Sequence, residues 1–245
     1  MHESKLDLIA KLLAKAERTT PEEAEALTEH AERLMLKYGI DQARLDEKRS
    51  RLGQDREQIV TELMPFDGTY ARDMRDLGAV VVHALGAVRP LYASGRGGGG
   101  GGGPSLLYLV GYASDVHQAK VLITSLQMQA MVAMRAWWVG ERHRRWHHTE
   151  GDRRRARSGF IRGFGVGAAE RIRESRMQII DDAGPGTDLV LASRLERVDA
   201  AVGEMSTRRA RQRDGADAGS FYSGRRSGRE ANTGGRAVRG QVDGT

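Results

Sequence analysis

The 245-residue chain contains no cysteine, and after Lys48 it contains one lysine, Lys120. The lack of cysteine excludes disulfides and thiolate metal sites and is typical of a reducing compartment. No apolar run approaches 18 residues, and the N-terminus lacks the charged-then-apolar pattern of a secretion signal. We therefore expect a cytoplasmic protein that does not contact a membrane. Aromatic residues make up 5% of the chain, too few for a broad base-stacking platform.

Positive charge is concentrated in the last third of the chain. The net charge is +6, and residues 151–245 carry 19 arginines against 13 carboxylates. Such an asymmetry indicates an anionic partner. A genome whose base composition favours arginine codons explains the excess equally well, and both explanations stay open.

Residues 1–48 have the pattern of a small helical module. Apolar positions predict a helix over 4–18, and Thr20-Pro21-Glu22-Glu23 is a helix start in which Thr20 caps and Pro21 takes the first helical position. Gly39 is a typical left-handed stop for that second helix. Asp41 then caps a short third helix ending near Lys48. The predicted unit is a helical hairpin with an added helix.

This module resembles a known family in three stretches. They are Lys5 to Ala16 (KLDLIAKLLAKA), Thr20 to Ala26 (TPEEAEA) and Leu34 to Ile40 (LMLKYGI). Together they are similar to the bacterial and phage domain-of-unknown-function family 2786, a hairpin that ends in a Lys-Tyr-Gly or Lys-His-Gly turn. The resemblance implies that an α+β region follows. It implies little about activity, because the family has none established, and its phage and mobile-element context favours nucleic acid only slightly.

The following region predicts a small α+β layer. After a polar linker at 49–56 come a strand at 57–66, a helix at 69–85, a strand at 87–93 and a strand at 105–110. The seven glycines at 97–103 lack the lysine and spacing of a phosphate-binding loop, so we interpret them as a hairpin tip. A long central helix at 114–142 has the widest apolar face of the chain. The predicted fold class is α+β and mostly helical, with one domain at 57–230 and a disordered Arg/Gly tail at 231–245.

Glycines recur every fourth residue after the basic segment. Gly159, Gly163 and Gly167 lie on one face of a predicted helix. Each costs that helix about 1 kcal/mol relative to alanine, so the close approach of another backbone is the expected compensation. The spacing Phe160-x-x-Gly163-x-x-x-Gly167 returns as Phe221-x-x-Gly224-x-x-x-Gly228. Either these segments pack together, or the repeat is a coincidence in a glycine-rich chain.

The basic segment beyond the central helix is the main candidate for a binding site. Its cations can neutralise phosphates, and one interleaved tryptophan can stack on a base. The candidate contacts to DNA or RNA are Arg142, Arg144, Arg145, Trp146, Arg153, Arg154, Arg155 and Arg157. Against this hypothesis, the chain has no recognisable DNA-binding fold signature.

Metal and catalytic sites have weaker support. His143 and His147 are one helical turn apart, which suits two zinc ligands, but the surrounding arginines repel a dication and Arg144 stands where a zincin glutamate would be. Ser114 and Asp115 follow a strand and start a helix, where both are ordinary capping residues. We find no catalytic constellation and expect no cofactor.

Three hypotheses follow from the sequence. The first is a non-enzymatic protein that binds nucleic acid, or acts beside a nucleic-acid machine, through residues 142–157. The second is a hydrolase whose site lies near the strand–helix junction at 111–115. The third is a homo-oligomeric assembly protein that pairs through its glycine-faced helices.

Overall fold

The structure is a computed structural model, and it describes residues 8, 11, 12, 15, 21–52, 57–93, 104–145, 148–207 and 216–231, with the backbone alone for part of the first long helix. Its helices are α2 (Pro21–Arg51), α3 (Ala71–Leu85), α4 (Ala113–Glu141), α5 (Glu150–Asp182), α6 (Thr187–Gly203) and α7 (Ala218–Glu230). Its strands are β1 (Ile59–Phe66), β2 (Arg89–Tyr92) and β3 (Ser105–Tyr112). The predicted α+β class and the mostly helical content are confirmed.

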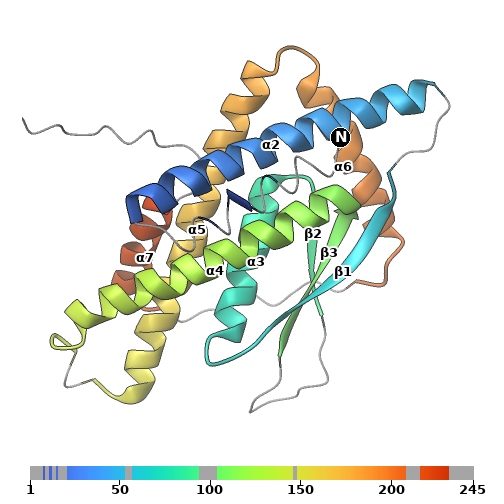
Figure 1. Cartoon of the computed structure of the whole chain (residues 1–245). Coiled ribbons are helices and arrows are strands. Elements are labelled where there is room, and N and C mark those ends of the chain that lie inside the picture. Colours follow the sequence, from blue (N-terminus) through green and yellow to red (C-terminus); the bar gives the residue numbers. More distant parts are fainter. Residues whose placement is uncertain are drawn as a thin grey trace, which may run out of the picture.

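The three strands form one antiparallel sheet in the order β1-β3-β2. Pro65 lies within β1, opposite Leu106. A proline is tolerated there because β1 is an edge strand with one free side. Leu107 and Leu109 of β3 are fully buried on the face that α3 and α4 cover, whereas Tyr112 on the opposite face contacts α6 through Val198. Helices therefore pack on both faces of the sheet near its upper end in Figure 1.

The long helix α4 forms the centre of the core, as its apolar periodicity predicts. Val116, Ala119, Ile123, Leu126 and Ala130 are fully buried along it. Figure 1 shows α4 crossing the molecule from the sheet to the corner where α5 begins. At that corner Thr149 caps α5 through a reciprocal capping box. The two ends of α4 thus lie in different surroundings, one beside the sheet and one at a basic surface.

The predicted helix stop at Gly39 is wrong, because α2 continues without a break from Pro21 to Arg51. Gly39 does not have a positive φ, and Tyr38, Ile40 and Ala43 around it are buried. Burial of this continuous face favours an unbroken helix over a turn at Gly39. The linker predicted at 49–56 accordingly begins as helix.

α5 and α7 form the most extensive helix–helix contact among the described elements. They run parallel, since Gly159 meets Asp217, Gly163 meets Phe221, and Gly167 meets Arg225. A parallel pair within one chain requires a return connection, and α6 lies within it (Figure 1).

Several predictions fall on residues that the structure does not describe. They are the bulk of the helix at 4–18 and hence the hairpin, the glycine tract at 97–103, Trp146, His147 and the tail from 232. Among the described helices, none is both long enough and apolar enough to cross a membrane.

Candidate functional site

One arginine collects three carboxylates from distant parts of the chain. Nε of Arg194, on α6, donates to Oδ2 of Asp115 at 3.0 Å, Nη1 donates to Oδ2 of Asp46 at 2.7 Å, and Nη2 donates to Oε2 of Glu57 at 2.8 Å. The guanidinium carbon lies 3.6 Å from the centroid of the Tyr112 ring. Arg194 is 3% exposed. The cluster therefore joins α2, the residues before β1, α4 and α6 in one buried ion network.

The charges of this network do not balance, because three carboxylates share one guanidinium. Burial raises the pKa of Asp115 to about 6, with Glu57 and Asp46 adding to the rise and Arg194 opposing it. Burial works against the Arg194 cation, but Asp115 and Glu57 outweigh it and raise the pKa of Arg194. Burial is thus the main cause of the shift at Asp115, whereas the neighbouring carboxylates are the cause of the shift at Arg194.

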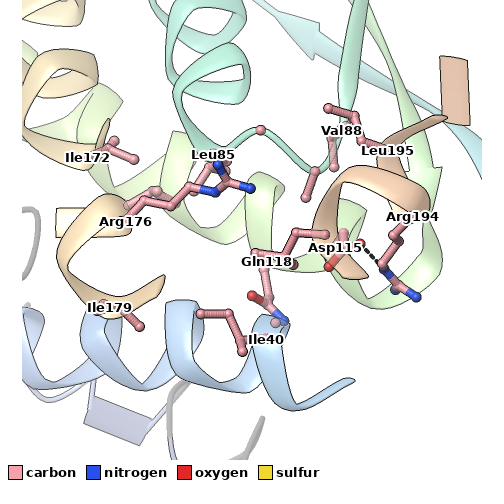
Figure 2. Close-up of a pocket in the computed structure, with 15 residues that line it drawn as sticks. Ile40, Leu85, Val88, Asp115, Gln118, Ile172, Arg176, Ile179, Arg194 and Leu195 are labelled. Carbon is pink, nitrogen blue, oxygen red and sulfur yellow. Dashed lines mark hydrogen bonds and ion pairs between the residues drawn. The ribbon is translucent and has the colours of Figure 1, made fainter. Parts of the chain in front are cut away.

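A cavity of about 60 Å³ borders this network. Five helices and the turn between α3 and β2 contribute to it, and Figure 2 shows Asp115 and Arg194 at one side. Its apolar wall includes Ile40, Leu85, Val88, Ile172, Ile179 and Leu195. Apolar walls, a few polar groups and a perturbed carboxyl are features of small-molecule sites, but this cavity is far smaller than the roughly 300–1,000 Å³ of a typical one.

Two side chains in the cavity present donors that have no acceptor among the described residues. Nε2 of Gln118 is buried and has no hydrogen-bond partner. Arg176 makes no hydrogen bond or ion pair with any described residue, and burial lowers its pKa, opposed by the charge of Asp115. In Figure 2 the Arg176 guanidinium extends from α5 toward the middle of the cavity, and Gln118 hangs from α4 toward Ile40.

The strand–helix junction at 111–115 does not have the predicted capping arrangement. The amide of Ser114 donates to Oε1 of Glu57 at 2.6 Å, and its hydroxyl donates to Oε2 of the same carboxylate at 3.0 Å. Glu57 thus caps α4 from another element, while Asp115 faces Arg194. The interpretation of both side chains as ordinary local caps is corrected, because tertiary contacts supply their partners.

The basic segment lies at the opposite end of α4, and its arginines fall into two groups. Arg145 is half-buried, bonds to Asp217 at 3.1 Å and to Glu141 at 3.4 Å, and lies 6.0 Å from the Trp137 ring centroid. Arg157 is 2.5 Å from Glu150 and lies 5.1 Å from the Trp138 ring centroid. Arg157 thus joins α5 to α4, and Arg145 joins the end of α4 to the N-cap of α7.

The other described arginines of the segment are more open to solvent. Arg142 and Arg154 are exposed. The side chain of Arg144 is 79% exposed beside Glu141, and that of Arg155 is 62% exposed beside Asp152. Arg153 is 36% exposed and lies 3.9 Å from Glu150. Exposed ion pairs are worth about 0–1 kcal/mol, so a phosphate can compete with these carboxylates.

A second hollow, which we call the methionine groove, adjoins this corner. Its volume is about 720 Å³. Its lining includes Tyr70, Met74, Met128, Met131, Met134, Arg135, Trp138 and Arg157. Burial raises the pKa of Tyr70, while Arg157 and Arg154 oppose that rise. The charges of these two arginines therefore reach the methionine groove.

The candidate metal ligands and the candidate pairing glycines lie in different parts of the structure. His143 is exposed on the turn after α4, and no group of three histidine, aspartate or glutamate residues suited to a metal occurs in the described part of the chain. Gly159, Gly163 and Gly167 face α7 within the same chain. A second copy could use that face only by replacing α7.

Comparison with known families identifies the N-terminal part of the chain. Residues 5–42 match the family described as "Protein of unknown function (DUF2786)". The resemblance predicted from the lysine, cap and Lys-Tyr-Gly residues is thereby confirmed. No curated protein and no solved structure matches the chain. The DUF2786 stretch ends inside α2, where Gly39 and Ile40 line the cavity of Figure 2.

The Arg194 network and the cavity were not predicted from the sequence. Their residues come from positions 39–57, 85–88, 115–122, 172–179 and 191–195. No local pattern links these positions. The nearest signal was the strand–helix junction at 111–115, which supplies Asp115 to both the network and the cavity.

Proposed function

We propose that the protein binds nucleic acid at the corner between α4 and α5, with single strands preferred. The supporting observation is the position of four exposed arginines next to the methionine groove. They are Arg142, Arg144, Arg154 and Arg155. The cations neutralise phosphates, and the groove offers Tyr70 and Trp138 to an unstacked base.

Only some arginines of the basic segment are proposed to contact phosphate. Arg145 and Arg157 are engaged with Glu141, Asp217 and Glu150 and with tryptophan rings. We therefore assign them to the support of the corner and assign phosphate contact to the exposed group. Residues 141–157 contain seven arginines and three carboxylates (Glu141, Glu150 and Asp152), so their formal net charge is +4.

Single strands are favoured by the shape of the groove. A volume of about 720 Å³ is within the range of ligand sites, roughly 300–1,000 Å³, and bases held in a duplex cannot enter it without unstacking. Methionine side chains adapt to flat ligands. Arg135 is exposed at the rim and Arg157 lies over Trp138, so cation–π contacts accompany stacking.

Fluorescence anisotropy with labelled single-stranded and duplex oligonucleotides tests this proposal. The test variant changes the four exposed arginines to alanine, and the expected log–log salt slope of the wild type is about −3 for four single-strand phosphate contacts. The matched control removes four exposed arginines elsewhere: Arg49, Arg51, Arg173 and Arg226.

Binding that is lost in the test variant and retained in the control supports the corner. Equal loss in both variants would show a non-specific effect of net charge. Absence of binding by the wild type at low salt would end the proposal. If a Trp138→Leu variant binds single strands as tightly as the wild type, the methionine groove does not take part in binding.

A further inference from the structure

Arg176 lines the cavity bordered by the Arg194 network and has no partner among the residues that the structure describes. No described residue accepts a hydrogen bond from it, and burial lowers its pKa. Arginine does not give up its proton in proteins, so Arg176 brings a full positive charge and several N–H donors to the cavity. Its nitrogens are not among the buried atoms without a partner in the described part of the chain, so they are accessible to solvent and to a ligand that carries acceptors.

The position of Arg176 is fixed by the turn that ends α3. A Cβ on Gly86 would lie 3.0 Å from the guanidinium carbon and 3.0 Å from Nη1. Gly86 has φ 65°, the left-handed region. The guanidinium therefore lies flat against a backbone that has no side chain, with its remaining edge toward the cavity (Figure 2).

A second donor lines the same cavity. Nε2 of Gln118 is buried without a partner on α4, across from α5. Arg176 and Gln118 both present donors to the cavity, so a ligand that fits it carries acceptors. The carboxylate of Asp115 is bonded to Arg194 through Oδ2 at 3.0 Å, and no hydrogen bond between described residues joins it to Arg176 or Gln118.

The walls and the size restrict the ligand further. Ile172 and Ile179 flank Arg176 on α5, and Leu85, Val88 and Ile40 close the other sides. A volume of about 60 Å³ holds a group of a few heavy atoms, because one water needs roughly 10–15 Å³ of such space. The nearby negative charge of Asp115 disfavours a multiply charged anion such as phosphate.

We propose that this cavity binds a short monocarboxylate, with its carboxylate on Arg176, a further hydrogen bond from Gln118, and its apolar end against the isoleucine wall. Arginine suits this role because its planar fork matches a carboxylate. The same carboxylate chemistry occurs in a small amino acid, whose ammonium group would face Asp115. The site is separate from the nucleic-acid corner, since Gln118 and Arg142 are 24 residues apart on α4, about 36 Å along the helix.

Thermal shift and calorimetric titration of the full chain test this proposal. The probes are sodium propionate, alanine and sodium phosphate, each against sodium chloride at equal ionic strength. The expected result is a saturable rise of Tm with propionate or alanine, and whichever of the two binds identifies the source of the carboxylate. Binding of phosphate in preference to both would overturn the proposal, as would no response to either.

Variants assign the binding to the named donors. Arg176→Met keeps the stem and removes the cation, so we expect its Tm without ligand to equal or exceed that of the wild type, with affinity reduced at least about tenfold. Gln118→Met should give a smaller loss. Arg173→Met, an exposed arginine one turn earlier on α5, is the control and should bind as the wild type does. Unchanged affinity in Arg176→Met would overturn the assignment.

Discussion

The carbonyl oxygen of Phe221 lies so close to Gly163 that a Cβ on this glycine would sit 2.0 Å from it. The relationship is reciprocal, since a Cβ on Gly224 would sit 1.9 Å from the carbonyl oxygen of Phe160. The matched spacing of the two segments is therefore a packing motif with local two-fold symmetry between parallel helices. Backbones at this distance make Cα–H···O contacts, and these add to dispersion along the whole seam.

Gly163→Ala should destabilise the protein by about 3 kcal/mol or more, because α7 must move away before a methyl group can fit. Urea unfolding measures the change. Gly140→Ala is the matched control, since Gly140 is a helical glycine of α4 with no atom within 4 Å of its added Cβ. That control should be neutral or stabilising by up to about 1 kcal/mol. Equal behaviour of the two variants would show that the α5–α7 contact does not contribute to stability.

Arg194→Met should cost about 3–5 kcal/mol, because three carboxylates would remain without their cation and two of them are buried. Arg89→Met removes a surface pair with Asp199, whose side chain is 48% exposed, and should cost less than about 1 kcal/mol. Chemical denaturation of both variants gives the comparison. A small effect at Arg194 would mean that the carboxylates are neutral or hydrated in the folded protein.

Asp115 should make stability depend on pH in a defined direction. Its pKa is raised from 3.8 to about 6 by burial, so the folded state binds the proton more tightly than the unfolded chain. This contribution to stability is complete below pH 3.8 and is lost as pH rises through 6. The free energy of unfolding of the wild type minus that of Asp115→Asn should fall over this window by as much as about 3 kcal/mol. Titrations of other groups largely cancel in the difference.

The control for that experiment is Asp181→Asn, a change at an exposed carboxylate of α5. Its difference curve is the baseline against which that of Asp115→Asn is compared. A curve for Asp115→Asn that follows this baseline would contradict the raised pKa and leave Asp115 as an ordinary ionised partner of Arg194.

Arg144 and Arg145 should differ although they are neighbours that share Glu141. Arg145 is 15% exposed and also reaches Asp217, the residue whose carboxylate caps α7. Its replacement by methionine should lower stability by about 1–2 kcal/mol and loosen α7, as measured by proteolysis. Arg144→Met should leave stability within about 0.5 kcal/mol and weaken nucleic-acid binding instead. The opposite pattern would reverse the roles that we assign to the two residues.

Much of the element order could be predicted from local chemistry. The apolar period of α4, the strand pattern of β1 and the glycine after α3 each specify their own element, and Gly86 indeed has the left-handed conformation that ends a helix. Gly39 shows the limit of such rules. Its Lys-Tyr-Gly setting favours a stop, but the buried contacts of Tyr38, Ile40 and Ala43 keep α2 continuous.

The sequence by itself determined the α+β class, the DUF2786 stretch, the basic segment and the repeated Phe-Gly spacing, because each depends on residues close together in the chain. Only the tertiary structure decided which arginines of that segment support the corner and which face solvent. It also decided that Asp46, Glu57 and Asp115 meet Arg194, and that Arg176 lines the adjoining cavity with no partner among the described residues. The physical reason is that burial and charge pairing arise between segments as much as 148 residues apart, and local patterns carry no information about such distances.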